Sequence, residues 1–429
     1  GRRAPPRRLA PARLGRRTGP GGGHMTERFL RMPAWARMLA YLSSAMAVLS
    51  TARVMTGAQQ LTAEGTMRSA IELSLPIALA GLGGLWSERS GVINIGLEGM
   101  MVLGTWFGAY GGIAYGPWQG VLLGIIGGAI GGLLHAIATV VFGVDHIISG
   151  VSINLLAVGL TEFLTSVSWG GVSTRESPTI PQNVTEVDLF PFLNKPLETL
   201  AGQNRFFLSD MADLFLAATT NLSLLIPVAV ALFPLTYWVL WKTPFGLRLR
   251  SAGEDPDAAD SLGVAVYRVK FIAVTMSGAL AGLGGVCLVY LFSGKFQSGQ
   301  VNGRGFIGLA AMIFGNWRPG GLVAGAGLFG FMDSMQSQVD ETAHALLVVA
   351  AIIFSLAGIY TAIKRRWVPT AVFAAVTLGC LWWYASTDEL PRELIPYFPH
   401  FTTLLVLVFA SQRLRMPAAN GRTWRRGGH

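Results

Sequence analysis

The stretch LWSERSGVINIGLEGMM, residues 85–101, ends one apolar segment and begins the next. The cluster SERS at 87–90 carries the charge that separates the two segments. Asn94 and Glu98 then follow inside a run that is otherwise apolar. A carboxylate within a membrane helix is unfavourable unless it is paired, protonated or in contact with water. The position of Glu98 therefore needs a structural or a functional reason.

The composition around this stretch is typical of a membrane protein. Hydrophobic residues make up 52% of the 429 residues and charged residues only 13%, whereas a soluble domain has roughly 25% charged residues. Apolar segments recur along the whole chain, which favours one integrated membrane domain over a soluble domain with an anchor. We therefore expect an all-α polytopic membrane protein.

The net charge of +10 does not by itself indicate a nucleic-acid partner. Seven arginines lie within the first 24 residues, in a Pro-, Gly- and Arg-rich stretch that cannot form a core. We expect residues 1–33 to be a disordered basic tail, and we interpret 1–24 as sequence upstream of a native start at Met25. Most of the other positive charges flank apolar segments, as membrane topology requires.

The cysteines and histidines do not indicate a chemical site. Cys287 and Cys380 both lie in apolar segments, where cysteine usually serves as a small buried hydrophobic residue. The six histidines show no metal-ligand spacing, and the sequence contains no phosphate-binding G-x-x-x-x-G-K-[ST] loop. We expect neither a metal site nor nucleotide hydrolysis of that type in this chain.

About ten segments are candidates to cross a membrane, for which a helix needs about 20 mostly apolar residues. They are 36–55, 69–86, 92–114, 119–142, 147–169, 219–241, 270–292, 344–363, 368–385 and a short one at 400–412. Two briefer runs between 304 and 332 are split by NWRPG at 316–320, which predicts a broken helix pair or a re-entrant hairpin. The membrane domain is therefore expected to extend over 34–412.

Positive charges orient these segments, because loops rich in Lys and Arg stay in the cytoplasm. The loop 242–270, the turn 364–366 and the basic tail 413–429 are all rich in these residues, so we place them and both termini in the cytoplasm. The loop 170–212 is then extracytoplasmic. Lys295 and Arg304 also fall outside, against the rule, so this topology explains the region around them least well.

Two parts of the chain contain similar short sequences in the same order. The hexapeptide LAGLGG occurs at 79–84 and again at 280–285. Each copy precedes an IGL tract with a methionine three residues beyond its leucine, and this alignment pairs Glu98 with Ala310. In the topology above the two copies run in opposite directions, as in the inverted repeats of many transporters. The alternative is chance similarity in a chain rich in Gly and Leu.

Polar residues within the apolar segments are the candidates for a transport path. Asn94 and Glu98 are four residues apart, so a helix would place them on one face. Glu98 either bonds a neighbouring helix or freed backbone groups, or it lines a substrate path. Asn154 and Glu162 form a second pair in 147–169, for which the same two roles remain open.

The loop 242–270 contains the signals of a short helix. Asp255 can cap it, Pro256 suits its first position, Asp257 favours its positive end, and Gly263 suits its exit. The small apolar face expected for this helix consists of Ala258, Ala259 and Leu262. Such a helix either docks into a groove of a partner protein or is a solvated connector.

Three stretches give the chain a specific resemblance. ERSGVINIGLEGMMVLGTW, FGLRLRSAGEDPDAADSLGV and GRGFIGLAAMIFGNWRPGG resemble signature stretches of bacterial ABC-transporter permeases for nucleosides. These permeases belong with the ribose-type simple-sugar permeases and are more distantly related to branched-chain amino acid permeases. The likeness covers roughly residues 65–335 in the same order. The N-terminal extension and the tail beyond 364 depart from the family pattern.

The resemblance implies a multi-pass subunit of an ABC importer in the bacterial cytoplasmic membrane, without enzyme activity or a cofactor of its own. ATP and Mg would bind a separate cytoplasmic ATPase. The other implied partners are a second permease subunit in a heterodimer and an extracytoplasmic substrate-binding lipoprotein. Nucleic acid is not among them. The residues implied to contact the ATPase are Glu254, Asp255, Pro256, Asp257, Ala258, Ala259, Asp260, Leu262 and Gly263.

Nucleosides are the implied substrate, and the nominated pathway residues are Asn94, Glu98, Asn154 and Phe314. A ribose or other simple-sugar permease is the nearest alternative. A proton-coupled secondary transporter, with Glu98 or Glu162 as the proton site, is a second alternative, although it would have no obvious use for the capped helix in 242–270. A membrane scaffold would leave the repeat and the broken helix unexplained.

Overall fold

The computed structural model describes residues 34–170, 175–337, 340–391, 393–394, 397–398 and 414–427. The chain divides into two units, Gly1–Ala47 and Val48–His429. Of the first unit only the beginning of helix α2 is described. The predicted disordered tail 1–33 and the predicted short span 400–412 lie outside the described residues.

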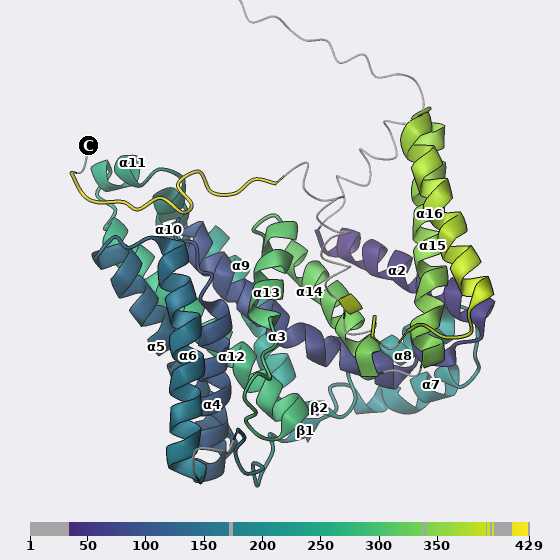
Figure 1. The fold of residues 1–429 in the computed structure, drawn as a ribbon, viewed down its shortest axis with the longest axis horizontal. Coiled ribbons are helices and arrows are strands. Elements are labelled where there is room, and N and C mark those ends of the chain that lie inside the picture. Colours follow the sequence, from purple (N-terminus) through teal and green to yellow (C-terminus); the bar gives the residue numbers. More distant parts are fainter. Residues whose placement is uncertain are drawn as a thin grey trace, which may run out of the picture. The chain divides into compact units, whose positions relative to one another are not determined.

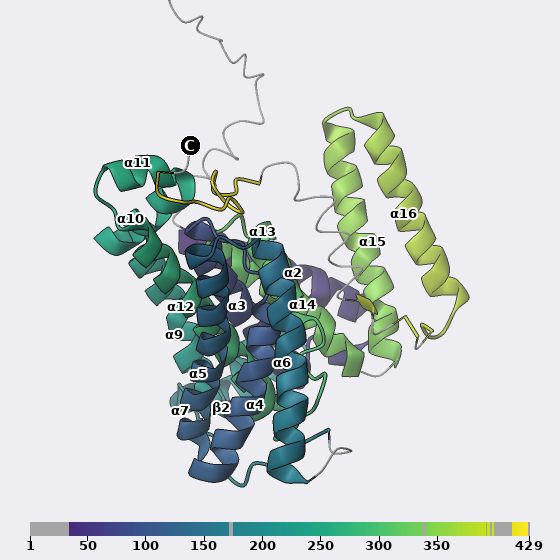
Figure 2. The same cartoon turned by 60° about the vertical axis from the view of Figure 1, so that its left-hand side comes forward.

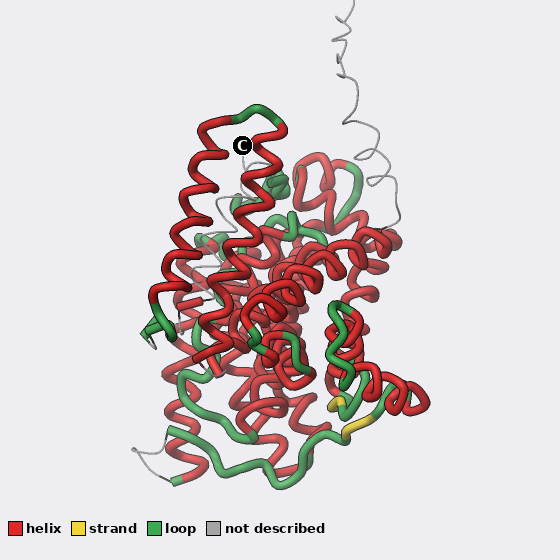
Figure 3. Tube along the Cα trace, turned by 90° about the vertical axis from the view of Figure 1, so that its right-hand side faces the viewer, coloured by secondary structure: helices red, strands yellow, loops and turns green. Residues whose placement is uncertain are grey.

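Helices make up most of the described chain (Figure 3). The sequence order is α2 (Ala34–Thr56), η1 (Gln59–Leu61), α3 (Glu64–Arg89), α4 (Leu97–Tyr115), α5 (Pro117–Ala136), η2 (Ile137–Val141), α6 (His146–Trp169), β1 (Glu186–Val187), α7 (Pro191–Ala201), α8 (Leu208–Ala217), β2 (Leu222–Ser223) and α9 (Leu225–Lys242). It continues with α10 (Pro244–Glu254), α11 (Pro256–Ser261), α12 (Val266–Leu288), η3 (Val289–Ser293), α13 (Arg304–Phe314), α14 (Pro319–Ser334), η4 (Met335–Ser337), α15 (Asp340–Ile363) and α16 (Trp367–Ser386) (Figure 1).

Eight of the described helices are long and apolar enough to cross a membrane, which confirms the all-α polytopic fold. Between α6 and α9, where the sequence predicts a long loop, lie the short helices α7 and α8. The strands β1 and β2 pair antiparallel there, with Glu186 opposite Ser223. The predicted broken pair is also present as α13 and α14, joined by a turn in which Asn316 and Trp317 adopt positive φ.

Helix α4 begins later than the sequence pattern predicts. Residues 92–96 belong to a non-helical stretch after α3, and the helix starts at Leu97. Its first turn lies beside Asn154, which is eight residues into α6. At 1.5 Å per residue this is roughly 12 Å from the start of α6. Helix α4 therefore begins inside the group formed with its neighbours α5 and α6 (Figure 2).

Glycine allows the central helices to approach at backbone distance. A β-carbon added to Gly104 of α4 would collide with the backbone of Gly282 of α12, and one added to Gly132 of α5 would lie 3.0 Å from Gly278 Cα. In lipid, helix association depends on such close packing because burial from water supplies no driving force between the helices. The glycine-rich runs are therefore packing surfaces.

The LAGLGG echo marks corresponding positions in an inverted arrangement. Helices α3 and α12 cross antiparallel, with Gly83 beside Ser277 and Gly284 beside Pro76. A β-carbon on Gly81 of the first copy would lie 2.6 Å from the carbonyl oxygen of Gly308 in α13. A β-carbon on the equivalent glycine of the second copy, Gly282, would lie 2.6 Å from the carbonyl oxygen of Gly124 in α5. The antiparallel crossing of the two copies is the arrangement that an inverted repeat requires. The IGL echo pairs Glu98 with Ala310, and that pairing stays a prediction.

Candidate functional site

Glu98 binds the start of α13. Its Oε1 accepts a hydrogen bond from Gly303 N and its Oε2 one from Gly305 N, both at 2.8 Å. A β-carbon on Gly305 would lie 2.6 Å from Glu98 Cα, so the first turns of α4 and α13 touch. The amides that begin a helix lack partners within it and attract negative charge. Glu98 supplies both the hydrogen-bond acceptors and the negative charge, which accounts for a carboxylate within an apolar segment.

Asn94 does not share a helix face with Glu98, because it precedes α4. Its side chain is fully buried, and its Nδ2 donates to Ser277 Oγ of α12 at 2.9 Å. The i, i+4 interpretation is therefore wrong: the two side chains reach different helices. Within the described part of the chain, Asn94 Oδ1 has no hydrogen-bond partner.

Asn154 makes two further hydrogen bonds at the start of α4. Its Oδ1 accepts from Gly99 N at 2.7 Å and its Nδ2 donates to Ile95 O at 3.1 Å. Both partners are backbone groups at the point where loop becomes helix. Glu162, farther along α6, is exposed and accepts from Ser298 Oγ at 3.0 Å. Asn154 and Glu162 thus hold different segments to α6.

Phe314 stands apart from the other three nominees. It ends α13, whereas Glu98 binds the beginning of that helix. Its ring centroid lies 6.2 Å from that of Phe329 in α14, and the side chain packs against the main core. The structure therefore brings Asn94, Glu98 and Asn154 together around one helix start, and Phe314 to a separate packing contact.

A cavity of about 400 Å³ lies beside these ties and was missed by the sequence reasoning. One wall is apolar, with Leu73, Leu288 and Phe292. The rest of the lining is polar and consists of Ser293, Gln297, Gln300, Asn302 and Arg304, together with Gly299. The signal was the amide-rich run FQSGQVNGR at 296–304, in the region that the charge rule explained least well.

The cavity offers polar groups without free charge. Of the described residues that line it, only Arg304 is charged, and its Nε and Nη2 donate to Asp333 Oδ2 at 3.0 and 2.6 Å. Glu98, the carboxylate of α4, is engaged by α13. Gln300 Oε1 accepts from Ser293 Oγ at 3.2 Å. The arrangement can bind an uncharged ligand that carries hydroxyl and amide groups.

The short helix predicted in 242–270 is present as α11. Asp255 Oδ1 accepts from Ala258 N at 3.0 Å, Pro256 occupies the first position, and Gly263 has a φ of +83°. An additional helix, α10, precedes it and is capped by Thr243, whose side chain accepts from Gly246 N at 3.2 Å. The sequence signals for the start and the end of α11 are confirmed.

The three apolar residues predicted to form one face of α11 do not do so, and Leu262 directly follows its last residue. Leu262 is 86% exposed and Ala258 is exposed, whereas Ala259 is 3% exposed. Ala259 packs with Ala252 and Val266. The expectation of a shared face is wrong because successive helical positions point about 100° apart. Ala258 and Leu262 remain available to another protein, and Ala259 attaches the helix to its own chain.

Comparison with known proteins places this geometry in a family. Residues 67–357 match the family described as branched-chain amino acid transport system / permease component. The chain belongs to this permease family. It is thus a transport component and a multi-pass membrane protein, and the match includes α4, α11, α13 and the cavity.

Three relatives of the permease are informative. It is 37% identical over 267 residues to the guanosine ABC transporter permease protein NupQ of Bacillus subtilis, covering 61% of this chain and 78% of the relative. It is 35% identical over 300 residues to the nucleoside ABC transporter permease protein NupC of Lactococcus lactis, covering 66% and 87%. A putative glucose ABC transporter permease protein of Haloferax volcanii is 29% identical over 367 residues, covering 83% and 96%.

No solved structure gives a significant match to the permease. The family match ends at residue 357, so the described residues of the C-terminal segment, 414–427, lie outside it.

Proposed function

We propose that this chain is the membrane-spanning permease subunit of an ABC importer that carries nucleosides across the bacterial cytoplasmic membrane. The observation that carries the proposal is the identity of 35–37% to two nucleoside permeases over more than three quarters of their length. The chain itself performs no chemistry. A separate ATPase subunit hydrolyses ATP with Mg, so this chain needs no cofactor.

The cavity supports an uncharged substrate. An amino acid carries a charged amino group and a charged carboxylate, and both would need partners when removed from water. The described lining has one charged group, Arg304, which already binds Asp333. Amides suit the hydroxyls of a nucleoside, and Phe292 can contact its base. A sugar would fit the amides but gain less from the apolar wall, so glucose-type transport is the second candidate.

The proposal assigns α11 to the ATPase. Exposed Leu262 and Ala258 are suited to insertion into a groove, and Asp255 and Gly263 fix the length of the helix. A second permease subunit, different from this one, completes the path, and a lipoprotein delivers substrate outside. The pairs of permease names among the relatives, such as NupC and NupB of Lactococcus lactis, support a heterodimer. The loop 242–270 and both termini are cytoplasmic and 170–212 is outside.

Each carboxylate oxygen of Glu98 accepts a hydrogen bond, and this argues against a proton-coupled transporter. A proton carrier must release its proton to a path, whereas Glu98 uses both oxygens to hold the first turn of α13. Asn94 and Asn154 likewise serve as ties beside the path in this proposal. In this proposal the cavity lined by Phe292, Gln297 and Gln300 serves as the gate or vestibule for substrate.

Uptake by host cells tests the function. Cells that lack this chain should lose uptake of labelled guanosine or uridine and regain it with the wild-type gene. Unlabelled nucleosides should compete, and glucose and leucine should not. Depleting ATP should stop uptake, whereas collapsing the proton gradient at constant ATP should not. Competition by glucose would favour the sugar alternative, and dependence on the proton gradient would exclude an ABC importer.

A pair of phenylalanine variants tests the cavity. Phe292→Ala should lower nucleoside uptake by roughly threefold to tenfold, because losing one aromatic contact removes about 1 kcal/mol of binding. Phe163→Ala is the matched control, since Phe163 is 62% exposed on α6 and does not line the cavity. Equal uptake by the two variants at equal membrane abundance would remove the cavity from the path.

A further inference from the structure

The C-terminal segment 414–427, predicted from the sequence only as part of a basic tail, is packed onto the chain. Its backbone binds the end of α10 and the turn after α3: Ala419 N donates to Gly253 O at 2.9 Å, and Gly421 N donates to Gly91 O at 3.2 Å. Ala419 is 3% exposed. In Figures 1 and 2 the segment runs in yellow beside α10 and α11. It is therefore part of the folded structure around α11.

The end of the segment holds α11. Trp424 Nε1 donates to Asp257 Oδ1 at 2.7 Å, and Arg426 Nε donates to Asp260 Oδ2 at 3.0 Å. The Trp424 ring also packs on Tyr267 at the start of α12, with 5.0 Å between ring centroids. Arg426 is largely exposed, so its ion pair contributes little. The contacts of Trp424 therefore hold α11 more strongly than the ion pair of Arg426 does.

Helix α11 depends on such ties because it is too short to be stable alone. It has six residues, of which only Pro256 and Ala259 are buried. Ala259 packs in a small cluster with Ala252 and Val266, and Trp424 packs against the same cluster. The segment thus supplies part of the apolar surface on which α11 rests.

The middle and beginning of the segment reach the ends of the central helices. Asn420 Nδ2 donates to Glu88 Oε2 at 2.9 Å, and the same oxygen accepts from Trp317 Nε1 at 2.6 Å. Arg415 N donates to Asn316 Oδ1 at 2.8 Å. Glu88 lies in the last turn of α3, and Asn316 and Trp317 form the turn between α13 and α14. The segment therefore connects α11 to helices of both halves of the repeat.

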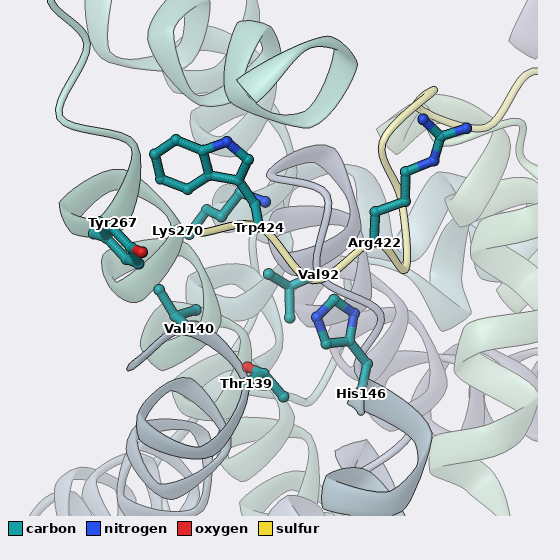
Figure 4. A pocket seen from close by; sticks show the side chains of 8 residues that line it. All are labelled: Val92, Thr139, Val140, His146, Tyr267, Lys270, Arg422 and Trp424. Atoms are coloured by element: carbon teal, nitrogen blue, oxygen red, sulfur yellow. The ribbon is translucent and has the colours of Figure 1, made fainter. Parts of the chain in front are cut away.

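A small cavity lies beneath Trp424, between the segment and the ends of α6 and α12. Arg422 and Trp424 line it from the segment, Tyr267 and Lys270 from α12, and His146 from the start of α6 (Figure 4). The hydrogen bonds of the segment to α11 and to Glu88 lie on either side of this cavity.

We propose that the segment 414–427 belongs to the coupling machinery and transmits displacement of α11 to the ends of α3 and the α13–α14 turn. Trp424 and Asn420 act as positioning residues at its two contacts. The proposal rests on the proposed function for the ATPase that displaces α11. The mechanical link is a property of this chain alone and can be tested without a partner.

Hydrogen exchange on the purified full-length permease tests the link. Trp424→Ala should speed exchange roughly tenfold in α11, where local opening now requires breaking that contact. It should also speed exchange at residues 88–92, which lie at the other contact. Trp382→Ala is the matched control, since Trp382 is 73% exposed in α16 and should affect neither region. A change confined to α11, or no change at all, would overturn the link.

Transport by the assembled complex tests coupling. Trp424→Ala and Asn420→Ala should each keep the ATPase subunit bound but raise the ATP hydrolysed per nucleoside transported several-fold. An unchanged ratio, or loss of the ATPase subunit, would overturn coupling through the segment. If the wild-type complex shows no ATP-driven uptake, the proposed function fails instead, and the exchange measurement still decides the link.

Discussion

Glu98 joins the two halves of the permease through backbone amides 205 and 207 residues away. Hydrogen bonds to a charged group contribute about 1.5–3 kcal/mol each. Glu98→Gln removes the charge and turns one acceptor into a donor that faces an amide. We expect it to lower the free energy of unfolding by about 1–3 kcal/mol, seen as a lower midpoint of thermal unfolding in detergent, with a larger loss for Glu98→Ala.

Glu162→Gln is the control for Glu98, because its exposed side chain keeps an acceptor for Ser298. Its unfolding midpoint should match that of the wild type. The pH dependence of uptake should also remain unchanged in Glu98→Gln. A shifted pH profile with normal stability would instead make Glu98 a proton site, as in a secondary transporter.

Asp213 in α8 should make stability depend on pH. Its pKa is raised from 3.8 to about 6, chiefly by burial and further by the neighbouring Asp210 and Glu64, while Arg53 opposes the shift. Between these values the folded chain holds a proton that the unfolded chain has lost, so stability falls as pH rises from about 4 to about 6.

Asp213→Asn removes this effect and tests it. The difference in unfolding midpoint between the variant and the wild type should grow in favour of the variant from pH 4 to pH 6 and then stay constant. Scans at pH 4.5, 5.5 and 7 measure it. A difference that is constant over this range would mean that the Asp213 carboxyl is not shifted.

At the level of helices, the positions where two helices cross at glycines should accept no larger residue. Gly104→Ala places a methyl group against the backbone of Gly282, where neither atom can move aside. We expect a loss of at least about 2 kcal/mol, the usual size for a forced overpacking, or failure to accumulate in the membrane. Thermal unfolding and membrane abundance measure this.

Gly327 in α14 provides the matched control. No described atom lies within 4 Å of the place where its β-carbon would stand. Gly327→Ala should therefore be neutral or stabilise the protein by up to about 1 kcal/mol, because alanine favours helix over glycine. Equal damage by both alanines would mean that the α4–α12 crossing is looser than the structure indicates.

The sequence predicted the helices better than their beginnings and contacts. Apolar runs of sufficient length located the spans, and local signals at Asp255, Pro256 and Gly263 located α11. The start of α4 was not predictable because 92–96 is as apolar as the helix that follows. The hydrogen bonds of Glu98, Asn94 and Asn420 join residues far apart in sequence, so no local pattern encodes them. The amide-rich lining of the cavity was visible only as a departure from the charge rule.

For the molecule as a whole, the proposed topology places α11 and α7 on opposite sides of the membrane. One apolar helix, α9, separates them; its 18 residues span roughly 27 Å at 1.5 Å per residue, close to the thickness of the hydrocarbon core. Leu262→Cys on the α11 side and Phe192→Cys in α7 report the two faces, since these residues are 86% and 74% exposed.

The labelling is carried out in a Cys380→Ser background, because Cys287 is fully buried and Cys380 is not. In intact cells a membrane-impermeant maleimide should label Phe192→Cys and spare Leu262→Cys until the membrane is opened. If Leu262→Cys is labelled first, the membrane orientation is reversed. If both are labelled from one side, α9 does not cross. Labelling of Leu262→Cys in intact cells would place α11 outside and so separate it from a cytoplasmic ATPase, whereas protection of both cysteines would place α7 in the cytoplasm with α11.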